Sequence, residues 1–366
     1  MNFKKWRFLS AVVCFFLLLT LAAAVVGCKK SEEKEGPAAT PGGKKWKVGW
    51  SVDNTADPWK RNQMECGKAA LEKHPEIEVI VTDAQGQAAK QIADIEDLIA
   101  RQVDLIMVSP RDEKALQGVL AKAYKKGIHV VLVDRMVEGD QWTAAVRGDN
   151  VAIGRMTAEF MGQALKGKGE IVQIEGLPGT TTAIERKKGF EEVITKKYPG
   201  IKIIASQPGN YSKTDSTAVM ENFISAYGKR IKGVYAPSAN MALGAAIALE
   251  NAGIDPGSVV ICSVDGEMGE IKAILDGTLA STVTYSNCAN VAAEIAWRIL
   301  NKQDYPEVLQ MASTLITKEN ARDYYVEGKF SIDNVMWEEG KWSLEDLISK
   351  SKVYTKKEWM ELKKKM

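Results

Sequence analysis

Acidic and basic residues at a few places along the chain are suited to holding a small polar molecule. Asp134 and Arg135 are adjacent, Arg186 follows further along the chain, and Asp265 stands directly before a glycine. Carboxylates offer paired hydrogen-bond acceptors and guanidinium groups offer forked donors, so together they can bind neighbouring hydroxyl groups through several hydrogen bonds at once. This chemistry suits a compact molecule that carries many hydroxyl groups.

Two aromatic residues offer a second kind of contact. Trp59 and Tyr211 each lie near the start of a predicted helix, where a ring can lie against the C–H face of a sugar. Simpler roles stay open for all of these residues. They are helix–sheet packing for both rings, a salt bridge with Glu185 for Arg186, and a turn before glycine for Asp265.

The pattern of apolar residues predicts the framework that would position these side chains. Short apolar runs, separated by segments with helical periodicity, begin near Val48, Ile77, Leu105 and Ile128. A second series of strands is predicted at 170–176, 202–208, 233–238 and 259–265. The strands at 104–110 and 128–134 are apolar on both faces, as in a parallel sheet that helices cover on both sides. The sequence therefore predicts an α/β fold with two similar, Rossmann-like lobes.

The predicted strands end in polar residues in both series. These residues are Asp53, Asp83, Ser109, Asp134, Asp149, Glu175, Ser238 and Asp265. In open parallel sheets, ligands bind beyond the carboxyl ends of the strands. Two such edges that face each other would form a cleft.

Length and charge narrow the class of function. The 366 residues suggest two domains. His74 and His129 are the only histidines, and this small number argues against a histidine-rich zinc site and against a serine–histidine relay. Once residues 1–27 are removed, 46 Lys and Arg face 47 Asp and Glu, which excludes the basic excess of a nucleic-acid-binding surface.

The N-terminal segment has the pattern of an export signal. Three basic residues precede an apolar run over 8–26, which is followed by Gly27 and Cys28. Residues 25–28, VVGC, resemble the lipobox of bacterial lipoproteins, in which the cysteine carries the lipid. We therefore expect a lipoprotein signal peptide over 1–27, an anchor at Cys28 and a disordered tether over 28–45, rich in Lys, Glu, Gly and Pro. An uncleaved membrane anchor is the alternative.

Three cysteines remain in the exported chain: Cys66, Cys262 and Cys288. Their number is odd and none forms a CxxC pair, so the sequence predicts buried free thiols. A disulfide bond is the alternative that an exported location permits.

Several short segments have the order and spacing of a known family. They are DPWK after the first strand, 83–110, VVLVDR (130–135), GDN (148–150), GLPGTTTAIERKKGF (176–190), ASQPGNYSK (205–213), VMENF (219–223), MALGA (241–245), SVDG (263–266) and DGTLASTV (276–283). Over residues 46–320 the chain resembles the periplasmic sugar-binding proteins of the ribose and galactofuranose type, which are receptors for ABC importers.

The resemblance implies the type I periplasmic binding protein fold, whose two lobes are joined by a hinge of three crossings. The crossings are expected near 148–149, near 285–286 and near Thr314. The implied N-terminal lobe comprises 46–148 and 286–313, and the implied C-terminal lobe comprises 149–285 and 314–330.

Residues 331–366 extend beyond the resemblance. Their apolar residues stand among many charges, which predicts a helical extension packed on the outside of a lobe. Ser343, three residues before Asp346, is the expected N-cap of one helix. A surface for docking a partner is the alternative.

On the first lobe, the resemblance implies five ligand contacts. Asp57 and Trp59 fall where the family has an asparagine and a ring-stacking phenylalanine, and Lys60 replaces a second phenylalanine. Asp134 and Arg135 match the family's Asp-Arg pair.

On the second lobe, Arg186 matches the binding arginine, Tyr211 matches a stacking phenylalanine and Asp265 matches the hydroxyl-binding aspartate. Ser238 and Tyr285 depart from the ribose pattern, in which an asparagine and a glutamine are usual. These departures argue against ribose itself and favour another pentose or a furanose or pyranose hexose.

The resemblance implies a solute-binding lipoprotein that closes its lobes around one monosaccharide and delivers it to an ABC transporter permease. It also implies an exported monomer, in the periplasm or at the cell surface, with no cofactor, metal or nucleic-acid partner. A sensory receptor of the same fold, acting on a chemoreceptor or kinase, is the alternative.

An enzyme is the main competing class. The sequence has no GxSxG, HExxH, CxxC or complete P-loop, and in 162–169 the P-loop spacing ends in Gly169 instead of Ser or Thr. A pair of glycosidase carboxylates stays open as an alternative. The effector domain of a lactose-repressor-like regulator has this fold too, but the export signal argues against it.

Overall fold

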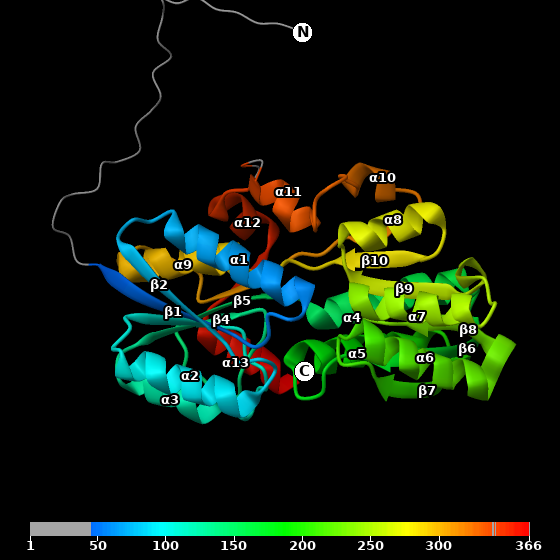
Figure 1. Ribbon diagram of the computed structural model, residues 1–366, viewed down its shortest axis with the longest axis horizontal. Helices are drawn as coiled ribbons and strands as arrows, with labels where there is room; N and C mark the ends of the chain where they lie inside the picture. Colours follow the sequence, from blue (N-terminus) through cyan, green and yellow to red (C-terminus); the bar gives the residue numbers. More distant parts are fainter. Residues whose placement is uncertain (1–44, 339, 341, 366) are drawn as a thin grey trace, which may run out of the picture. The chain divides into compact units, whose positions relative to one another are not determined.

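The computed structural model describes residues 45–338, 340 and 342–365. Two sheets with helices on both faces make up this part of the chain (Figure 1). The prediction of an α/β fold with two similar lobes is therefore confirmed. The predicted signal peptide, Cys28 and the tether up to residue 44 lie outside the described residues.

The N-terminal lobe is built on a seven-stranded sheet in the order β13-β11-β5-β4-β3-β1-β2. Its strands are β1 (Trp46–Val52), β2 (Ile77–Asp83), β3 (Leu105–Val108), β4 (His129–Val133), β5 (Ala144–Gly148), β11 (Val308–Met311) and β13 (Lys352–Tyr354). All pairs are parallel except β11 with β13. Helices α1 (Pro58–Glu72) and α9 (Ala289–Leu300) pack on one face, and α2 (Ala88–Ala100) and α3 (Gln117–Lys125) pack on the other.

The C-terminal lobe is built on a six-stranded sheet in the order β12-β10-β9-β8-β6-β7. Its strands are β6 (Lys168–Glu175), β7 (Gly200–Pro208), β8 (Ile231–Tyr235), β9 (Val260–Asp265), β10 (Ser281–Thr284) and β12 (Leu315–Thr317). Only β12 is antiparallel to its neighbour. Its helices are α4 (Asn150–Ala164) and α5 (Thr181–Lys197), which pack against each other, with α6 (Lys213–Tyr227), α7 (Ala239–Asn251), α8 (Met268–Asp276) and the short α10 (Ala321–Tyr324).

Continuous apolar runs produce strands that are buried on both faces. Every residue of β3 is buried, and so are four of the five residues of β4. Their alternate side chains enter two separate cores, one under α1 and α9 and one under α2 and α3. This double burial is typical of a parallel sheet between two helical layers.

The chain changes sheets four times. It leaves the seven-stranded sheet after β5, returns to it after β10, and passes back to the six-stranded sheet between β11 and β12. After β12 it returns once more and ends the seven-stranded sheet with β13. The structure therefore has four connections between the lobes, one more than the three crossings that were predicted.

The prediction for residues 331–366 is also incomplete. The segment forms α11 (Ile332–Glu338), α12 (Leu344–Lys350) and α13 (Lys356–Lys365), but β13 lies between the last two helices. A three-residue strand among lysines is too short to show as alternation in the sequence. Ser343 caps α12 as expected, by accepting a hydrogen bond from the backbone N–H of Asp346. Trp359 is fully buried in the core of the N-terminal lobe, so this segment is part of that core.

All three cysteines of the described residues are free thiols. Cys262 and Cys288 are buried and Cys66 is partly buried. The prediction of free thiols is confirmed. Burial raises the pKa of the Cys66 thiol to about 11, so the uncharged thiol predominates.

Candidate ligand-binding site

A cavity lies where the carboxyl ends of the two sheets face each other. Together with the open solvent at its mouth, it encloses about 370 Å³ of empty space. The structure brings all ten residues selected from the sequence to its wall, together with two more. The twelve are Asp57, Trp59, Lys60, Asp134, Arg135, Thr182, Arg186, Tyr211, Ser238, Asn240, Asp265 and Tyr285.

Helix starts position several of these side chains. Asp57 caps α1 by accepting hydrogen bonds from the backbone N–H groups of Trp59 and Lys60. Ser238 caps α7 in the same way, through the N–H of Met241. Capping residues are short and polar and lie at the N-terminal end of a helix, which here is the end that faces the cavity.

Backbone strain marks three other residues of the cavity wall. Asp134, Tyr211 and Asp265 have φ angles of 70°, 59° and 127°, in the region that residues other than glycine rarely adopt. Such conformations cost roughly 1–3 kcal/mol each and gather at functional sites, where the surrounding structure holds them. The strain therefore supports a functional role for this wall of the cavity.

Lys60 and Asp134 form the centre of the polar wall on the N-terminal lobe. The Lys60 ammonium donates hydrogen bonds to Asp134 Oδ2 at 2.8 Å, to Ser109 Oγ at 2.7 Å and to Gln63 Oε1 at 3.2 Å. It also lies 3.4 Å from Asp53 Oδ1. Since these partners occupy the donors of Lys60, its charge is balanced within the protein.

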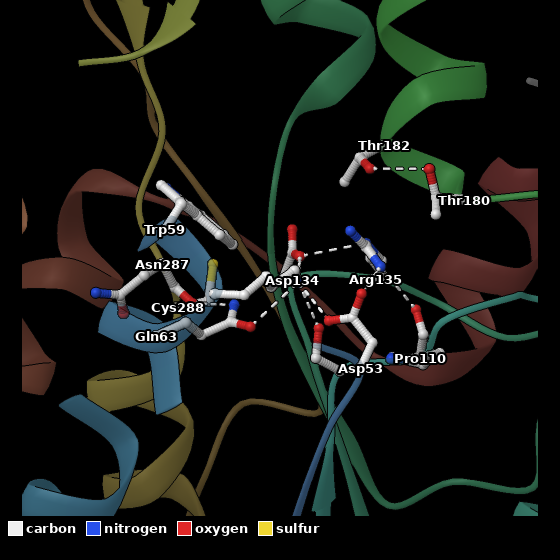
Figure 2. Close-up of polar contacts among 12 residues, drawn as sticks. Asp53, Trp59, Gln63, Pro110, Asp134, Arg135, Thr180, Thr182, Asn287 and Cys288 are labelled. Carbon is white, nitrogen blue, oxygen red and sulfur yellow. Dashed lines mark hydrogen bonds and ion pairs between the residues drawn. The ribbon is translucent and has the colours of Figure 1, made fainter. Parts of the chain in front are cut away.

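Arg135 joins the same cluster, as Figure 2 shows. Its Nη1 donates to Asp53 Oδ2 at 2.8 Å and to the carbonyl oxygen of Pro110 at 3.2 Å. Burial alone would raise the pKa of Asp134, but Lys60 and Arg135 outweigh that effect and lower it. Asp134 therefore stays ionised, as an acceptor for hydroxyl groups.

Arg186 is the main cation on the C-terminal lobe. Its Nε donates to Asn150 Oδ1 at 3.0 Å and its Nη1 donates to the carbonyl oxygen of Pro237 at 2.7 Å. Among the described residues Nη2 has no hydrogen-bond partner, which leaves it available to a ligand. The alternative salt bridge between Arg186 and Glu185 does not occur among the described residues, because Glu185 pairs with the buried Arg147 instead.

Asp265 lies beside Arg186, with Oδ1 3.6 Å from Nη1. Its Oδ2 accepts a hydrogen bond from the N–H of Ala239 at 3.1 Å. Burial raises the pKa of Asp265, and Arg186 offsets only part of this rise. Burial raises the pKa of Asp57 as well. The ionisable side chains of the wall, apart from its two tyrosines, are three aspartates, one lysine and two arginines.

The three aromatic residues take different positions. Trp59 and Tyr285 stack with ring centres 5.9 Å apart, and the Arg186 guanidinium lies 4.3 Å from the centre of the Tyr285 ring. The Tyr211 hydroxyl lies 3.0 Å from Thr182 Oγ1. Trp59 and Tyr211 are thus cavity residues that also take part in packing.

Thr182 and Asn240 are the two cavity residues that the sequence analysis missed. Each stands at the start of a helix, two residues after a capping residue, Thr180 or Ser238. A threonine or asparagine in the first turn of a helix is ordinary, so its type alone marks no function. The signal in the sequence that could have marked Thr182 and Asn240 is their position two residues after a helix N-cap that follows a strand.

Hydrogen bonds join the two lobes at the edge of the cavity. The N–H of Glu113 donates to the carbonyl oxygen of Gly179, and the N–H of Met136 donates to Thr181 Oγ1, both at 3.2 Å. Glu113 and Met136 belong to the N-terminal lobe, and the acceptors belong to the C-terminal lobe. The structure therefore has the lobes closed on each other.

The described residues offer neither a metal-binding cluster nor a membrane-spanning helix. No group of three or more His, Cys, Asp or Glu residues there could hold a metal ion. None of the helices there is both long enough and apolar enough to cross a membrane.

The chain matches the periplasmic binding protein domain over residues 48–304. It is 32% identical to a galactofuranose-binding protein of Escherichia coli strain K12, with 75% of this chain and 89% of that protein covered. It is 28% identical to a ribose import binding protein of Bacillus subtilis strain 168, covering 83% and 98%. The solved fructose-binding periplasmic domain of a hybrid two-component system superposes with a TM-score of 0.74 at 27% identity, covering 83% and 99%. The chain belongs to the periplasmic binding protein family.

Proposed function

We propose that this protein binds one small, neutral, hydroxyl-rich molecule, a monosaccharide, between its two lobes and delivers it to the permease of an ABC importer. The observation that carries the proposal is the convergence of Asp134, Arg186 and Asp265 on one cavity from both sheets.

The donors and acceptors at the wall suit hydroxyl groups. Asp57 and Asp265 each have a carboxylate oxygen that accepts no hydrogen bond from a described residue, and Arg186 has Nη2 as a donor. A hydroxyl group can donate to a carboxylate and accept from a guanidinium at the same time. Since each cation of the wall already has an aspartate within 3.6 Å, the cavity favours a neutral sugar over a sugar phosphate or sugar acid.

The departures from the ribose pattern suggest which sugars fit. The Tyr285 hydroxyl donates a hydrogen bond to Asp134. Tyr285 therefore presents its ring to a ligand, whereas a glutamine at this position would present an amide. Ser238 uses its oxygen to cap α7. The cavity thus has fewer amide contacts, which supports a pentose other than ribose or a furanose or pyranose hexose. The relatives named for galactofuranose and fructose fall within this range, and the relative named for ribose falls outside it.

Closure supplies the mechanism. Contacts from both lobes to one ligand exist together only when the lobes are closed, so binding shifts the population toward the closed form. In this proposal the permease recognises the closed form. The protein is exported and anchored through Cys28, and it does not transform the ligand chemically.

A sensory role is the second candidate, favoured by the resemblance to the fructose-binding domain of a two-component system. In that role the closed form would act on a chemoreceptor or kinase. Genes for an ATPase and a permease beside this gene would support transport, and a gene for a sensor kinase in their place would support sensing.

A thermal-shift screen of the purified protein tests the proposed ligand class. The panel comprises D-ribose, L-arabinose, D-galactose, D-fructose, xylitol and myo-inositol, with galactose 6-phosphate and galacturonate as charged controls. A ligand that binds only the folded protein raises its melting temperature. We expect a shift with at least one neutral compound and none with the charged pair, whereas a shift with the charged pair alone would refute the proposal.

A further inference from the structure

Helix α11 lies on the fourth connection between the lobes (Figure 1). It contacts both lobes, through Val335 in the core of the C-terminal lobe and Asn334 on the other side. Just before it, Ser331 bridges to Glu267, and the N–H of Met268 donates to the carbonyl oxygen of Phe330 at 2.9 Å, both on the C-terminal lobe. On the other side, Asn334 Nδ2 donates to Asn62 Oδ1 of α1 at 2.9 Å. The helix is thus held between α8 and α1.

Asp333 of this helix reaches the crossing that follows β10. Its Oδ2 accepts a hydrogen bond of 2.6 Å from the backbone N–H of Asn287. Cys288, the next residue, has a φ angle of 63°, so the chain makes a strained bend at this point. The Asp333 carboxylate therefore holds a part of the crossing whose backbone is strained.

The same crossing holds the cavity side of α1. The carbonyl oxygen of Asn287 accepts a hydrogen bond from Gln63 Nε2 at 2.7 Å, and Gln63 Oε1 accepts one from Lys60 Nζ at 3.2 Å (Figure 2). Lys60 in turn donates to Asp134 Oδ2 at 2.8 Å. Gln63, Lys60 and Asp134 are all buried, so water does not substitute readily for a lost partner.

Asp134 is held by the crossing from its other side as well. Tyr285, two residues before Asn287, donates its hydroxyl to Asp134 Oδ1 at 2.6 Å. Both carboxylate oxygens of Asp134 therefore depend on residues 285–287, one directly and one through Gln63 and Lys60. A displacement of the crossing would move both hydrogen-bond donors of this carboxylate.

We infer that Asp333 is a positioning residue for ligand binding, which fixes the crossing that holds Asp134 in the cavity. This inference rests on the proposed function. Asp333 lies beyond the part of the chain that the family model matches, which ends at residue 304. The C-terminal segment thus reaches the binding site without touching the ligand.

A purely structural role is the competing explanation. Asp333 belongs to α11, but its carboxylate lies beside the N-terminal end of α9. An acidic group at this end of a helix stabilises the unpaired N–H groups there. Burial raises the pKa of Asp333 to about 6, so an ionised carboxylate is held here at a cost. A helix-capping role alone would change the melting temperature and leave the affinity for sugar as it is.

The test compares dissociation constants by isothermal titration calorimetry, with D-ribose, L-arabinose, D-galactose, D-fructose, xylitol and myo-inositol as probes. Asp333→Ala removes the acceptor, and we expect about tenfold weaker binding, as for the loss of one hydrogen bond to a charged group. Asp333→Asn retains an acceptor oxygen and should bind within about threefold of wild type. The control Lys350→Ala removes an exposed ion pair with Asp346 on α12, in the same C-terminal segment, and should leave the affinity unchanged.

Gln63→Leu provides an independent arm if Asp333→Ala does not fold. It leaves Asp333 in place and breaks the link between Asn287 and Lys60, so it should weaken binding about tenfold. The double variant Asp333→Ala/Gln63→Leu should bind about as tightly as Gln63→Leu alone, because both changes act on one network.

Unchanged affinity in Gln63→Leu, or in a folded Asp333→Ala protein with a lowered melting temperature, would overturn the inference and leave the proposed function intact. Absence of binding by the wild-type protein to all six probes would refute the proposed ligand class itself and the inference with it.

Discussion

The Tyr285 hydroxyl donates a hydrogen bond of 2.6 Å to Asp134 Oδ1, although 151 positions separate the two residues in the chain. Tyr285 follows the last parallel strand of one lobe, and Asp134 follows β4 of the other. The bond therefore joins the lobes at the cavity. Burial, together with the negative charge of Asp134, raises the pKa of Tyr285 well above its usual value, so Tyr285 keeps the proton that it donates.

Tyr285→Phe removes this hydrogen bond and keeps the ring that contacts Trp59 and Arg186. We expect about tenfold weaker sugar binding by isothermal titration calorimetry, because Asp134 loses one of its two donors. Tyr198→Phe is the matched control, since its hydroxyl bonds Glu159 near the surface of the C-terminal lobe. Equal affinity of Tyr285→Phe and wild type would contradict the importance of this contact.

Arg186→Ala should weaken sugar binding by about a hundredfold or more, because it removes the forked donor on the C-terminal lobe and leaves Asp265 without its cation. We expect the ligand-free variant to melt cooperatively, as wild type does. The surface pair of Arg230 with Glu170 offers the control Arg230→Ala, which should bind sugar normally. Full binding by Arg186→Ala would refute the assignment of the site.

Asp265→Ala should abolish the ligand-induced shift in melting temperature while the ligand-free protein stays folded. Asp265, at the end of β9, is the proposed hydroxyl acceptor, and no other carboxylate of the wall lies on the C-terminal lobe. A thermal-shift titration with the sugar that stabilises wild type measures this. A variant that keeps the wild-type shift would show that Asp265 makes no ligand contact.

Lys60→Met should destabilise the protein by about 3 kcal/mol, because it leaves buried carboxylates without a cation that balances them. Urea denaturation of the ligand-free protein measures the loss. Lys68→Met on the same helix is the control, since Lys68 and Glu72 form an exposed pair and should contribute no more than about 0.5 kcal/mol. Equal stability of the two variants would mean that the cluster around Asp134 tolerates an unpaired charge.

Stability should fall as the pH rises from about 5 to 9. Burial raises the pKa of Glu267 to about 9, and burial also raises the pKa values of Glu270 and Asp265. A carboxyl whose pKa is higher in the folded state contributes stability below its unfolded pKa of about 4.3, and this contribution is lost as the pH passes through the folded value. The melting temperature of ligand-free protein across this range measures the effect.

Glu267→Gln separates this group from the others. The neutral amide carries no charge to desolvate, so the variant should be more stable than wild type at pH 9, by at least about 1 kcal/mol, and similar to it at pH 5. A difference between variant and wild type that does not change with pH would contradict this origin.

The central part of the fold follows from local features of the sequence. Runs such as 104–110 and 128–134 are long and apolar enough to predict buried strands, and the polar residues that end the strands predict the ligand edge. The short strands are different. Strands β12 and β13 have three residues each, and they form because β10 and β11 offer edges to pair with. Such pairing depends on residues far away in the chain and leaves little trace in a local pattern.

The site could be predicted to a similar degree. The charged residues Asp134, Arg186 and Asp265 stand out by type and position. The neutral residues do not: Gln63 and Asn287 are ordinary residues of a helix and a loop, and their role depends on contacts between segments 224 positions apart. Asp333 was placed in a helix, but its approach to the crossing depends on the return of the chain to the first lobe.

A crystal structure of the protein with the sugar that stabilises it most is the most direct measurement. The sugar should lie between the lobes, with its hydroxyl groups within hydrogen-bonding distance of Asp134, Arg186 and Asp265. A sugar bound on an outer surface, with these three side chains still paired only to protein, would contradict the account.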